Sequence, residues 1–535
     1  MHKYININGK YGFGQDFKLS YSSVQQILDE MDRLGIWQTV IEFPAASNSL
    51  HRNRTLLQDL AQIPQWDSRV IPSFVRDVGA VIQKDAMDQI VQMLETYRPS
   101  CITLRPKSNK YRLRAIDIAL ERVKHLDPVI LIDIDQIKTD AGEDDLITLA
   151  KQFPNMRFVI RQIMYDGMPF IFDAMRRADN IYLDNSWLHT RDAVKIFCQF
   201  FGEERVLFGL GPKSNGGAAM AAIAYADISE AAKDKIRCGN FINLFSHPAD
   251  RQKLTENLRA VSNRVGNRFW TPFIENGTAP DVEIYDIHTH MGSTGSDWYL
   301  YDLTFENQVK AFEKDMEKYN IRKVVSSVSG MPDLIQANCE MEQAVRGKED
   351  RFLGYVRYNP NFDQAYTDAY LEERFRGGYY VGLKTLPHYM GVDIRDAKYD
   401  RMFRYAHEHH LPVLIHCWQK SLGSPMKCAE AASKWPNAKV ILGHTGGEDE
   451  GRLECEAIAN DPKYSNVYFE FCGSFKADRS WEETLRHIDH RRVLYGTDAC
   501  LHEISWEMGR LLSADIPDEK LTAILGANAK KLFGF

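Results

Sequence analysis

The stretch Tyr285–Gly292 reads YDIHTHMG and opens a series of eight short runs rich in β-branched and aromatic residues. Stretches with apolar residues at helical spacing separate these runs, for example DQAYTDAYLEERF at 363–375. The runs cover residues 283–290, 322–329, 351–358, 380–387, 412–417, 438–444, 466–471 and 492–498. Strand and helix alternating eight times predicts a parallel (β/α)8 barrel, a fold of about 250 residues.

The first half of the chain repeats this rhythm, with similar sequences at corresponding places. PNMRFVIRQ at Pro154–Gln162 matches PNAKVILGH at Pro436–His444, and RVLFGLGP at Arg205–Pro212 matches RVLYGTDA at Arg492–Ala499. Such a long period indicates a duplicated domain rather than a solenoid. We therefore predict an α/β protein that consists of two tandem (β/α)8 barrels.

Composition and charge narrow the classes of function. Of 535 residues, 44% are hydrophobic and 26% are charged, as in ordinary globular proteins. The net charge of −7 and the scattered basic residues argue against a nucleic-acid partner. The N-terminus does not resemble a secretory signal, no apolar segment is long enough to span a membrane, and nine cysteines form no CxxC pair. We expect a cytoplasmic protein with no membrane partner.

Histidine and aspartate side chains end several runs of the second half. His288 and His290 are two residues apart on one strand, so both side chains point the same way. His416, His444 and Asp498 end the fifth, sixth and eighth runs. Because strand ends converge at one mouth of a barrel, these five residues predict a nitrogen and oxygen site for Zn²⁺, or for Mn²⁺ or Fe²⁺.

The motifs DIHTH, IHC, GHTGG, GTDA and ANAKKLF resemble the metal-dependent amidohydrolase superfamily, most closely its amidohydrolase-related branch. The resemblance is strong over the second half and weak over the first. It implies a single metal ion, with a two-metal site less favoured, held by His288, His290, His416 and Asp498. It also implies that Asp498 transfers protons and that His444 lies beside the reacting group, both as catalytic residues.

Three further residues are candidates for binding a carboxylate-bearing small molecule. Lys384 ends the fourth run, where some superfamily members carry a carboxylated lysine that bridges two metals; a substrate contact or a plain strand-end charge are the alternatives. Arg357 ends the third run and could grip a carboxylate or form a structural ion pair. Trp418 follows the fifth run and could face a planar substrate.

The first half lacks the expected ligands when the two halves are aligned by eye. His288 and His290 fall on Asn6 and Asn8, and the other site residues fall on Ile132 or Asp133, Gln162, Gly211 and, for Lys384, Thr103. Amides are poor Zn²⁺ ligands, so we predict that this barrel has lost the site.

The polar strand-end residues of the first half leave its role open. They could hold an anion or pair with one another, and pairing is the favoured alternative: Arg76, Arg105, Asp133, Arg161 and Asp184. The barrel itself could be a structural mate in an intramolecular pseudo-dimer, with or without further homo-oligomerisation, or a regulatory domain. The predicted domains are a degenerate barrel at 1–266, a linker at 267–282 and a catalytic barrel at 283–535.

We expect a metal-dependent hydrolase that uses a metal-activated water to cleave a small amide, lactone or related carboxylic-acid substrate. A metal-dependent nonoxidative decarboxylase of a small carboxylic acid, aromatic or not, would use the same ligand set and is the first alternative. A non-catalytic binding or scaffold protein is the second.

Overall fold

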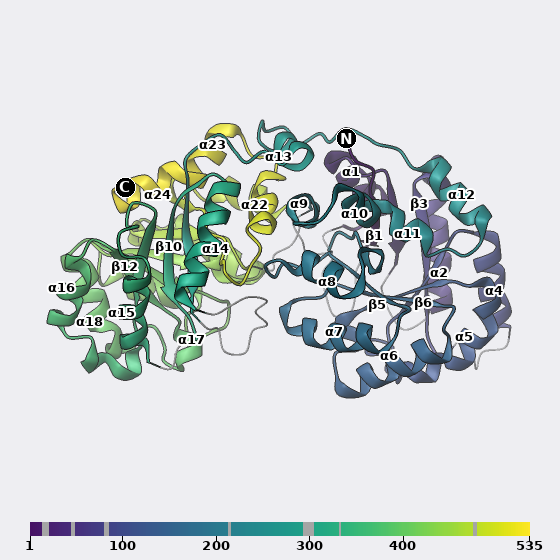
Figure 1. Cartoon of the computed structure of the whole chain (residues 1–535), viewed down its shortest axis with the longest axis horizontal. Coiled ribbons are helices and arrows are strands. Elements are labelled where there is room, and N and C mark those ends of the chain that lie inside the picture. The colour runs from purple at the N-terminus through teal and green to yellow at the C-terminus, as the bar shows by residue number, and fades with distance from the viewer. Residues whose placement is uncertain are drawn as a thin grey trace. The chain divides into compact units, whose positions relative to one another are not determined.

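The computed structural model describes residues 1–12, 21–43, 49–79, 85–211, 216–292, 304–330, 333–474 and 479–535, with the side chains of 49–52 excepted. The chain divides into two compact units, Met1–Val265 and Gly266–Phe535. Each contains one eight-stranded parallel sheet whose strands follow one another in chain order, with the helices outside the strands (Figure 1). The prediction of two tandem (β/α)8 barrels is therefore confirmed.

The N-terminal barrel is closed by a backbone hydrogen bond from Ile7 to Phe208, on either side of the seam between its first and last strands (3.2 Å). Its strands are β1 Ile5–Lys10, β2 Gln38–Glu42, β3 Val70–Arg76, β4 Cys101–Leu104, β5 Val129–Asp133, β6 Arg157–Arg161, β7 Ile181–Asp184 and β8 Val206–Leu207. Its helices are α1 Val24–Leu34, α2 Ser49–Leu60, α4 Ala86–Thr96, α5 Asp117–Val123, α6 Asp140–Gln152, α7 Met168–Arg177, α8 Ala193–Phe201, α9 Gly217–Tyr225, α10 Glu230–Asp234, α11 Asn240–Asn243 and α12 Pro248–Asn257.

The C-terminal barrel closes in the same way, through a hydrogen bond from Ile287 to Tyr495 (3.1 Å). Its strands are β9 Ile284–Met291, β10 Ile321–Val328, β11 Phe352–Arg357, β12 Tyr380–Thr385, β13 Pro412–His416, β14 Lys439–Gly443, β15 Val467–Glu470 and β16 Val493–Leu494. Its helices are α13 Trp270–Asn276, α14 Phe305–Lys318, α15 Leu334–Ala344, α16 Asp368–Arg376, α17 Pro387–Met390, α18 Asp400–Glu408, α19 Pro425–Ser433, α20 Asp449–Ala459, α21 Ser480–His487, α22 Ile504–Leu512, α23 Asp518–Thr522 and α24 Asn528–Phe533.

The duplication extends to buried polar contacts. The amide of Asn180 donates to the carbonyls of Ala150, Phe153 and Met156 just before β7. Asn466 does the same before β15, with the carbonyls of Ala432, Trp435 and Ala438. A π-helical turn follows α10 at Lys235–Gly239, and another follows α23 at Ala523–Ala527. Such matching details indicate descent of both barrels from one ancestral domain.

Each barrel is filled by side chains that its strands point inward. Ile5, Ile7, Leu131 and Val159 belong to this core in the N-terminal unit. Tyr285, Ile287, Leu414 and Ile441 belong to it in the C-terminal unit. These apolar layers leave the polar chemistry to the carboxyl ends of the strands, where a barrel mouth is built.

The segment expected to be a linker contains helix α13. Trp270 and Phe273 are fully buried, and Asn267 donates to the carbonyls of Leu512 and Ala514. The segment therefore packs as part of the C-terminal unit. Among the described residues, no helix combines the length and the apolar character that crossing a membrane requires. All nine cysteines are free thiols.

Candidate metal centre of the C-terminal barrel

The predicted site residues lie at the carboxyl ends of the C-terminal barrel strands. β9 carries His288 and His290, β13 ends at His416, and His444 and Asp498 follow β14 and β16. His444 and Asp498 adopt left-handed backbone conformations, with φ of 64° and 60°. Such conformations cost a non-glycine residue on the order of 1 kcal/mol and are typical of functional sites.

Three of the predicted ligands converge on one point. The ligand atoms of His288, His290 and Asp498 all lie within 4.8 Å of one another. His290 Nε2 is 3.0 Å from Asp498 Oδ1, and His288 Nε2 is 3.7 Å from the same oxygen. Two imidazoles and a carboxylate around a common point fit a divalent metal of the Zn²⁺, Mn²⁺ or Fe²⁺ type.

The protonation of these groups favours metal binding. Burial lowers the pKa of both His288 and His290, which keeps the imidazoles neutral with a lone pair to share. Burial alone would raise the pKa of Asp498, but the hydrogen bond with His290 outweighs it and holds the pKa well below its usual value. Asp498 is therefore ionised at neutral pH.

The other two histidines pair with each other. His444 Nε2 lies 3.0 Å from His416 Nδ1, and the two ring centroids are 4.6 Å apart. Burial lowers the pKa of His444 to about 4, so this ring too is neutral. His416 is outside both groups of potential ligands that the described residues form. Trp418 stacks almost parallel to the His416 ring, with an interplanar angle of 9°.

Lys384 is fully buried and lies directly at the site. Its Nζ is 2.6 Å from His288 Nε2. Burial lowers its pKa to about 7, so a neutral amine is accessible near physiological pH. This position places Lys384 beside the predicted metal site.

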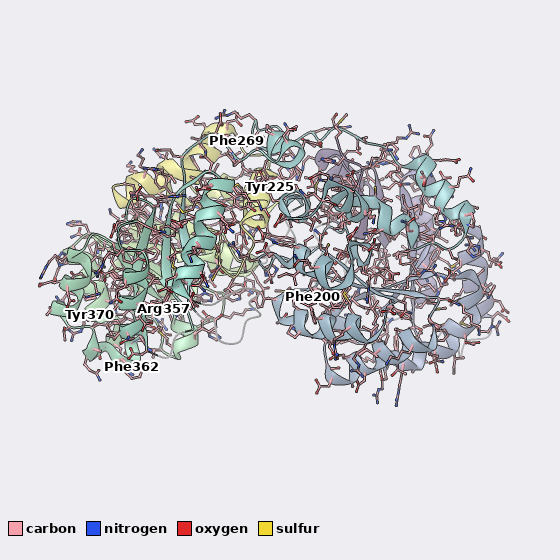
Figure 2. The ribbon with its side chains drawn as sticks, viewed as in Figure 1. Phe200, Tyr225, Phe269, Arg357, Phe362 and Tyr370 are labelled. Carbon is pink, nitrogen blue, oxygen red and sulfur yellow. The ribbon has the colours of Figure 1, made fainter. Side chains whose placement is uncertain are left out.

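Arg357 ends β11 inside the C-terminal unit (Figure 2) and is only 5% exposed. Within the described part of the chain, its Nε and Nη1 atoms have no hydrogen-bond partner, and it forms no ion pair. Burial lowers its pKa to about 10, which leaves it charged at neutral pH. The structure thus gives no support to the alternative of a structural ion pair, and a buried cation without a partner is suited to an anionic ligand.

Three buried polar residues of the C-terminal barrel were not predicted from the sequence: Glu470, His502 and Glu507. Glu470, the last residue of β15, lies 2.8 Å from His288 Nδ1. His502 and Glu507 form a buried pair at 3.1 Å in the segment after β16. The strand-end rule that identified the histidines applies equally to Glu470, whereas no sequence signal marks His502.

The aligned residues of the N-terminal barrel require a correction. Asn6 Oδ1 accepts hydrogen bonds from the backbone N–H groups of Asn8 (3.0 Å) and Leu210 (2.8 Å). Asp286 Oδ1 accepts the same pair from His288 (3.2 Å) and Thr497 (3.1 Å). Asn6 therefore corresponds to Asp286, and the counterparts of His288 and His290 are Asn8 and Lys10. The alignment of the two histidines with Asn6 and Asn8 was wrong by two residues.

Strand register resolves a second ambiguity of the alignment. Asp133 pairs with Arg161 across β5 and β6, as His416 pairs with Gly443 across β13 and β14. Gln162 and His444, the next residues along, share a left-handed conformation with φ of 62° and 64°. Asp133, rather than Ile132, is therefore the counterpart of His416.

Ion pairs occupy the mouth of the N-terminal barrel. Lys10 Nζ is 2.5 Å from Asp133 and 3.8 Å from Glu42. Arg161 lies 3.0 Å from both carboxylates, and Arg105 lies 3.5 Å from Asp133. The expected pairing of arginines with aspartates thus holds for Arg105 and Arg161. Among the described residues of this unit, no three His, Cys, Asp or Glu side chains gather as a potential metal site.

Comparison with known proteins agrees with this division of the chain. A model of the amidohydrolase family matches residues 285–535. No curated protein matches the chain.

Several solved structures are similar to about half of the chain. One is a probable 2-pyrone-4,6-dicarboxylic acid hydrolase from Acinetobacter baumannii with citric acid bound (15% identity, 48% of this chain and 100% of that chain, TM-score 0.36). Another is 2,6-dihydroxybenzoate decarboxylase from Rhizobium (16% identity, 47% and 99%, TM-score 0.38). A third is a dihydroxybenzoic acid decarboxylase from Polaromonas sp. JS666 with bound manganese and 2-nitroresorcinol (16% identity, 47% and 97%, TM-score 0.37). Over residues 285–535, the C-terminal unit matches the amidohydrolase family.

Proposed function

We propose that the C-terminal barrel is a metal-dependent hydrolase that acts on a small carboxylic acid with an amide, lactone or related bond. The observation that carries the proposal is the convergence of His288, His290 and Asp498 on one point at the barrel mouth. Zn²⁺ is the metal that this donor set favours first, with Mn²⁺ and Fe²⁺ as alternatives. When bound, such an ion supplies a Lewis acid and lowers the pKa of a coordinated water to about 7.

Asp498 and His444 would carry out proton transfer and orient the reacting group. Asp498 is a buried carboxylate that is ionised at neutral pH, and it would be the group that accepts a proton and passes it to a leaving group. His444 donates its Nδ1 hydrogen to the carbonyl of Cys472 (2.7 Å), so the neutral ring presents the lone pair of Nε2. That anchor sets the orientation of the ring toward the reacting group.

Substrate binding follows from Arg357 and the aromatic side chains. Arg357 is a buried guanidinium whose Nε and Nη1 have no hydrogen-bond partner among the described residues, and its positive charge suits a substrate carboxylate. Trp418 and Tyr389 both contact the His416 ring, and Tyr389 is 71% exposed. Such groups would suit a planar molecule with a carboxylate, and Lys384 would contact a second oxygen.

The aromatic contacts also support a second candidate, a nonoxidative decarboxylase of a small aromatic acid. An aromatic acid would stack on Trp418, and His444 or Asp498 would protonate the carbon that loses carbon dioxide. The two reactions differ in product rather than in ligand set. Carbon dioxide release from a carboxylated arene would therefore support the decarboxylase over the hydrolase.

The test uses the full chain reconstituted with Zn²⁺, Mn²⁺ or Fe²⁺. We expect one member of a panel of lactones, amides and hydroxylated aromatic acids, each bearing a carboxylate, to be converted, as followed by mass spectrometry with carbon dioxide capture. Conversion should disappear in the His288→Asn, His290→Asn variant. Conversion that persists in this variant would refute the proposal, and metal binding without any turnover would favour the scaffold alternative.

A further inference from the structure

We propose that Glu470 is a positioning residue that fixes the orientation and tautomer of His288, so that Nε2 of this ring faces the metal centre. The inference rests on the proposed function, because it concerns the same site. It follows from the contacts of His288, from the space made for Glu470, and from the equivalent contacts in the N-terminal barrel.

The two nitrogens of His288 face opposite partners. Nδ1 lies 2.8 Å from Glu470 Oε2 and 3.4 Å from Cys472 Sγ. Nε2 lies 2.6 Å from Lys384 Nζ and 3.7 Å from Asp498 Oδ1. A carboxylate only accepts hydrogen bonds, so Nδ1 must carry the hydrogen and Nε2 must carry the lone pair. The lone pair is then directed at the other predicted ligands.

Glu470 is itself held rigidly. It is fully buried at the end of β15 and accepts hydrogen bonds from the backbone N–H groups of His444 (3.3 Å) and Cys472. Gly496 leaves the space that it needs, since a Cβ at that position would come within 3.0 Å of the Glu470 carboxyl and 2.7 Å of His288. A carboxylate fixed by its backbone contacts can hold an imidazole in one orientation.

The N-terminal barrel retains the carboxylate although it has lost the histidine. Asp184, at the end of β7, lies 3.4 Å from Asn8 Nδ2, and Asn8 is the counterpart of His288. It also accepts the backbone N–H of Gln162 (2.9 Å), as Glu470 accepts that of His444. Gly209 makes room beside it as Gly496 does. The carboxylate thus has a shared structural role in both barrels, and only in the C-terminal barrel does it contact an imidazole.

The same arrangement argues against a second metal between Glu470 and His288. These two residues, with His444 and Cys472, form the other group of potential ligands in the described chain. Besides the 2.8 Å contact with His288 Nδ1, Glu470 already accepts backbone hydrogen bonds on both of its carboxylate oxygens. A direct hydrogen bond is therefore the better interpretation.

Metal affinity is the readout that separates positioning from a purely structural role. The full-length wild type, Glu470→Gln and the matched control Asp184→Asn would each be titrated with Zn²⁺ against a chromophoric chelator. Removal of such an outer carboxylate typically lowers metal affinity about 10- to 100-fold. We expect this loss in Glu470→Gln, and an affinity within twofold of wild type in Asp184→Asn. Thermal unfolding of the metal-free proteins reports the shared structural role separately.

Glu470→Asp provides a second variant should Glu470→Gln fail to fold. The shorter side chain, which the N-terminal barrel already carries, keeps the charge but withdraws it from Nδ1, so an intermediate loss of affinity is expected. Unchanged affinity in the folded Glu470 variants, or an equal loss in Asp184→Asn, would overturn the inference while leaving the proposed function intact. A wild type that binds no metal would instead overturn the proposed function and the inference together.

Discussion

The two barrels of this chain share one fold and differ in the polar side chains at the carboxyl ends of their strands. In the C-terminal barrel, His288, His290 and Asp498 surround a point suited to a metal cation. In the N-terminal barrel, Lys10 takes the place of His290, and its ammonium pairs with Asp133 and Glu42. The mouth of the N-terminal barrel thus carries buried charges of both signs that pair with one another, where the C-terminal barrel carries histidines.

Where the N-terminal barrel has a charged residue in place of a residue of the C-terminal mouth, a neighbouring residue carries the opposite charge. His290 Nδ1 contacts Ser327 on the neighbouring strand (3.1 Å), and the residue paired with Lys10 on β2 is Glu42. Gly443 on β14 corresponds to Arg161, which is fully buried between Glu42 and Asp133. A single change from histidine to lysine would leave an unpaired buried charge, so the additional carboxylates and arginines stabilise the altered mouth.

The largest effect should come from giving the C-terminal barrel the β1 residues of the N-terminal barrel. We expect His288→Asn with His290→Lys to lower kcat/KM by roughly 10³-fold or more, because a bound metal contributes several kcal/mol to stabilising the transition state. Steady-state kinetics on the substrate found in the panel would measure this. Asn8→Ser, at the counterpart of His288, is the control and should leave kcat/KM unchanged. Equal losses in both proteins would contradict the division of roles.

The next effect should be on stability in the N-terminal barrel. Arg161→Met leaves Glu42 and Asp133 short of a partner, and breaking a buried ion pair in this way costs about 3–5 kcal/mol. Hydrogen exchange of peptides from residues 1–265 would report the loss of the free energy of unfolding. Adding Glu42→Gln should recover part of the loss, because it removes one of the uncompensated charges. An unchanged exchange rate in Arg161→Met would mean that the ion cluster does not stabilise this barrel.

A smaller effect is expected at Arg357, where a substitution should weaken substrate binding but stabilise the folded state. Arg357→Met should raise KM for a carboxylate substrate about 10- to 100-fold, since a charged hydrogen bond contributes about 1.5–3 kcal/mol. It should also raise the free energy of unfolding by about 1 kcal/mol, because a buried cation without a partner is removed. Arg357→Lys, which keeps the charge but not the planar fork, should bind substrate with intermediate affinity. An unchanged KM would exclude Arg357 from the substrate site.

The smallest effect concerns the pH dependence of the N-terminal barrel. Burial raises the pKa of Asp184 from 3.8 to about 6, so the folded state binds its proton more tightly than the unfolded state. This contribution to stability is complete below pH 3.8 and is lost as pH rises through about 6, with a slope of at most about 1.4 kcal/mol per pH unit. Asp184→Asn should flatten the stability profile between pH 4 and 6, as measured by chemical denaturation. A profile equally steep in the variant would assign the proton to another group.

Much of this arrangement could be predicted from the sequence because parallel strands deliver their carboxyl ends to one mouth. That rule alone brings His288, His290 and Asp498 together, and places Lys384 and Arg357 close by. It does not specify side-chain rotamers. His416 ends its strand as expected, yet its ring pairs with His444 and lies parallel to Trp418, an arrangement that the strand-end rule does not predict.

The misalignment of β1 has a physical cause. The strand ININGK contains the pair Ile-Asn twice in succession, so a shift of two residues places similar residues on one another. Sequence similarity therefore could not distinguish Asn6 from Asn8 as the counterpart of His288. Only the backbone hydrogen bonds accepted by Asn6 and Asp286 determine the register.

The most direct test of the account is the number of metal atoms per chain, measured by inductively coupled plasma mass spectrometry after chelation and reconstitution of the full-length protein. The account predicts close to one divalent ion in the wild type and close to none in His288→Asn, His290→Lys. Close to zero in the wild type, or one ion retained in the variant, would contradict the claim that the C-terminal barrel alone carries the metal centre.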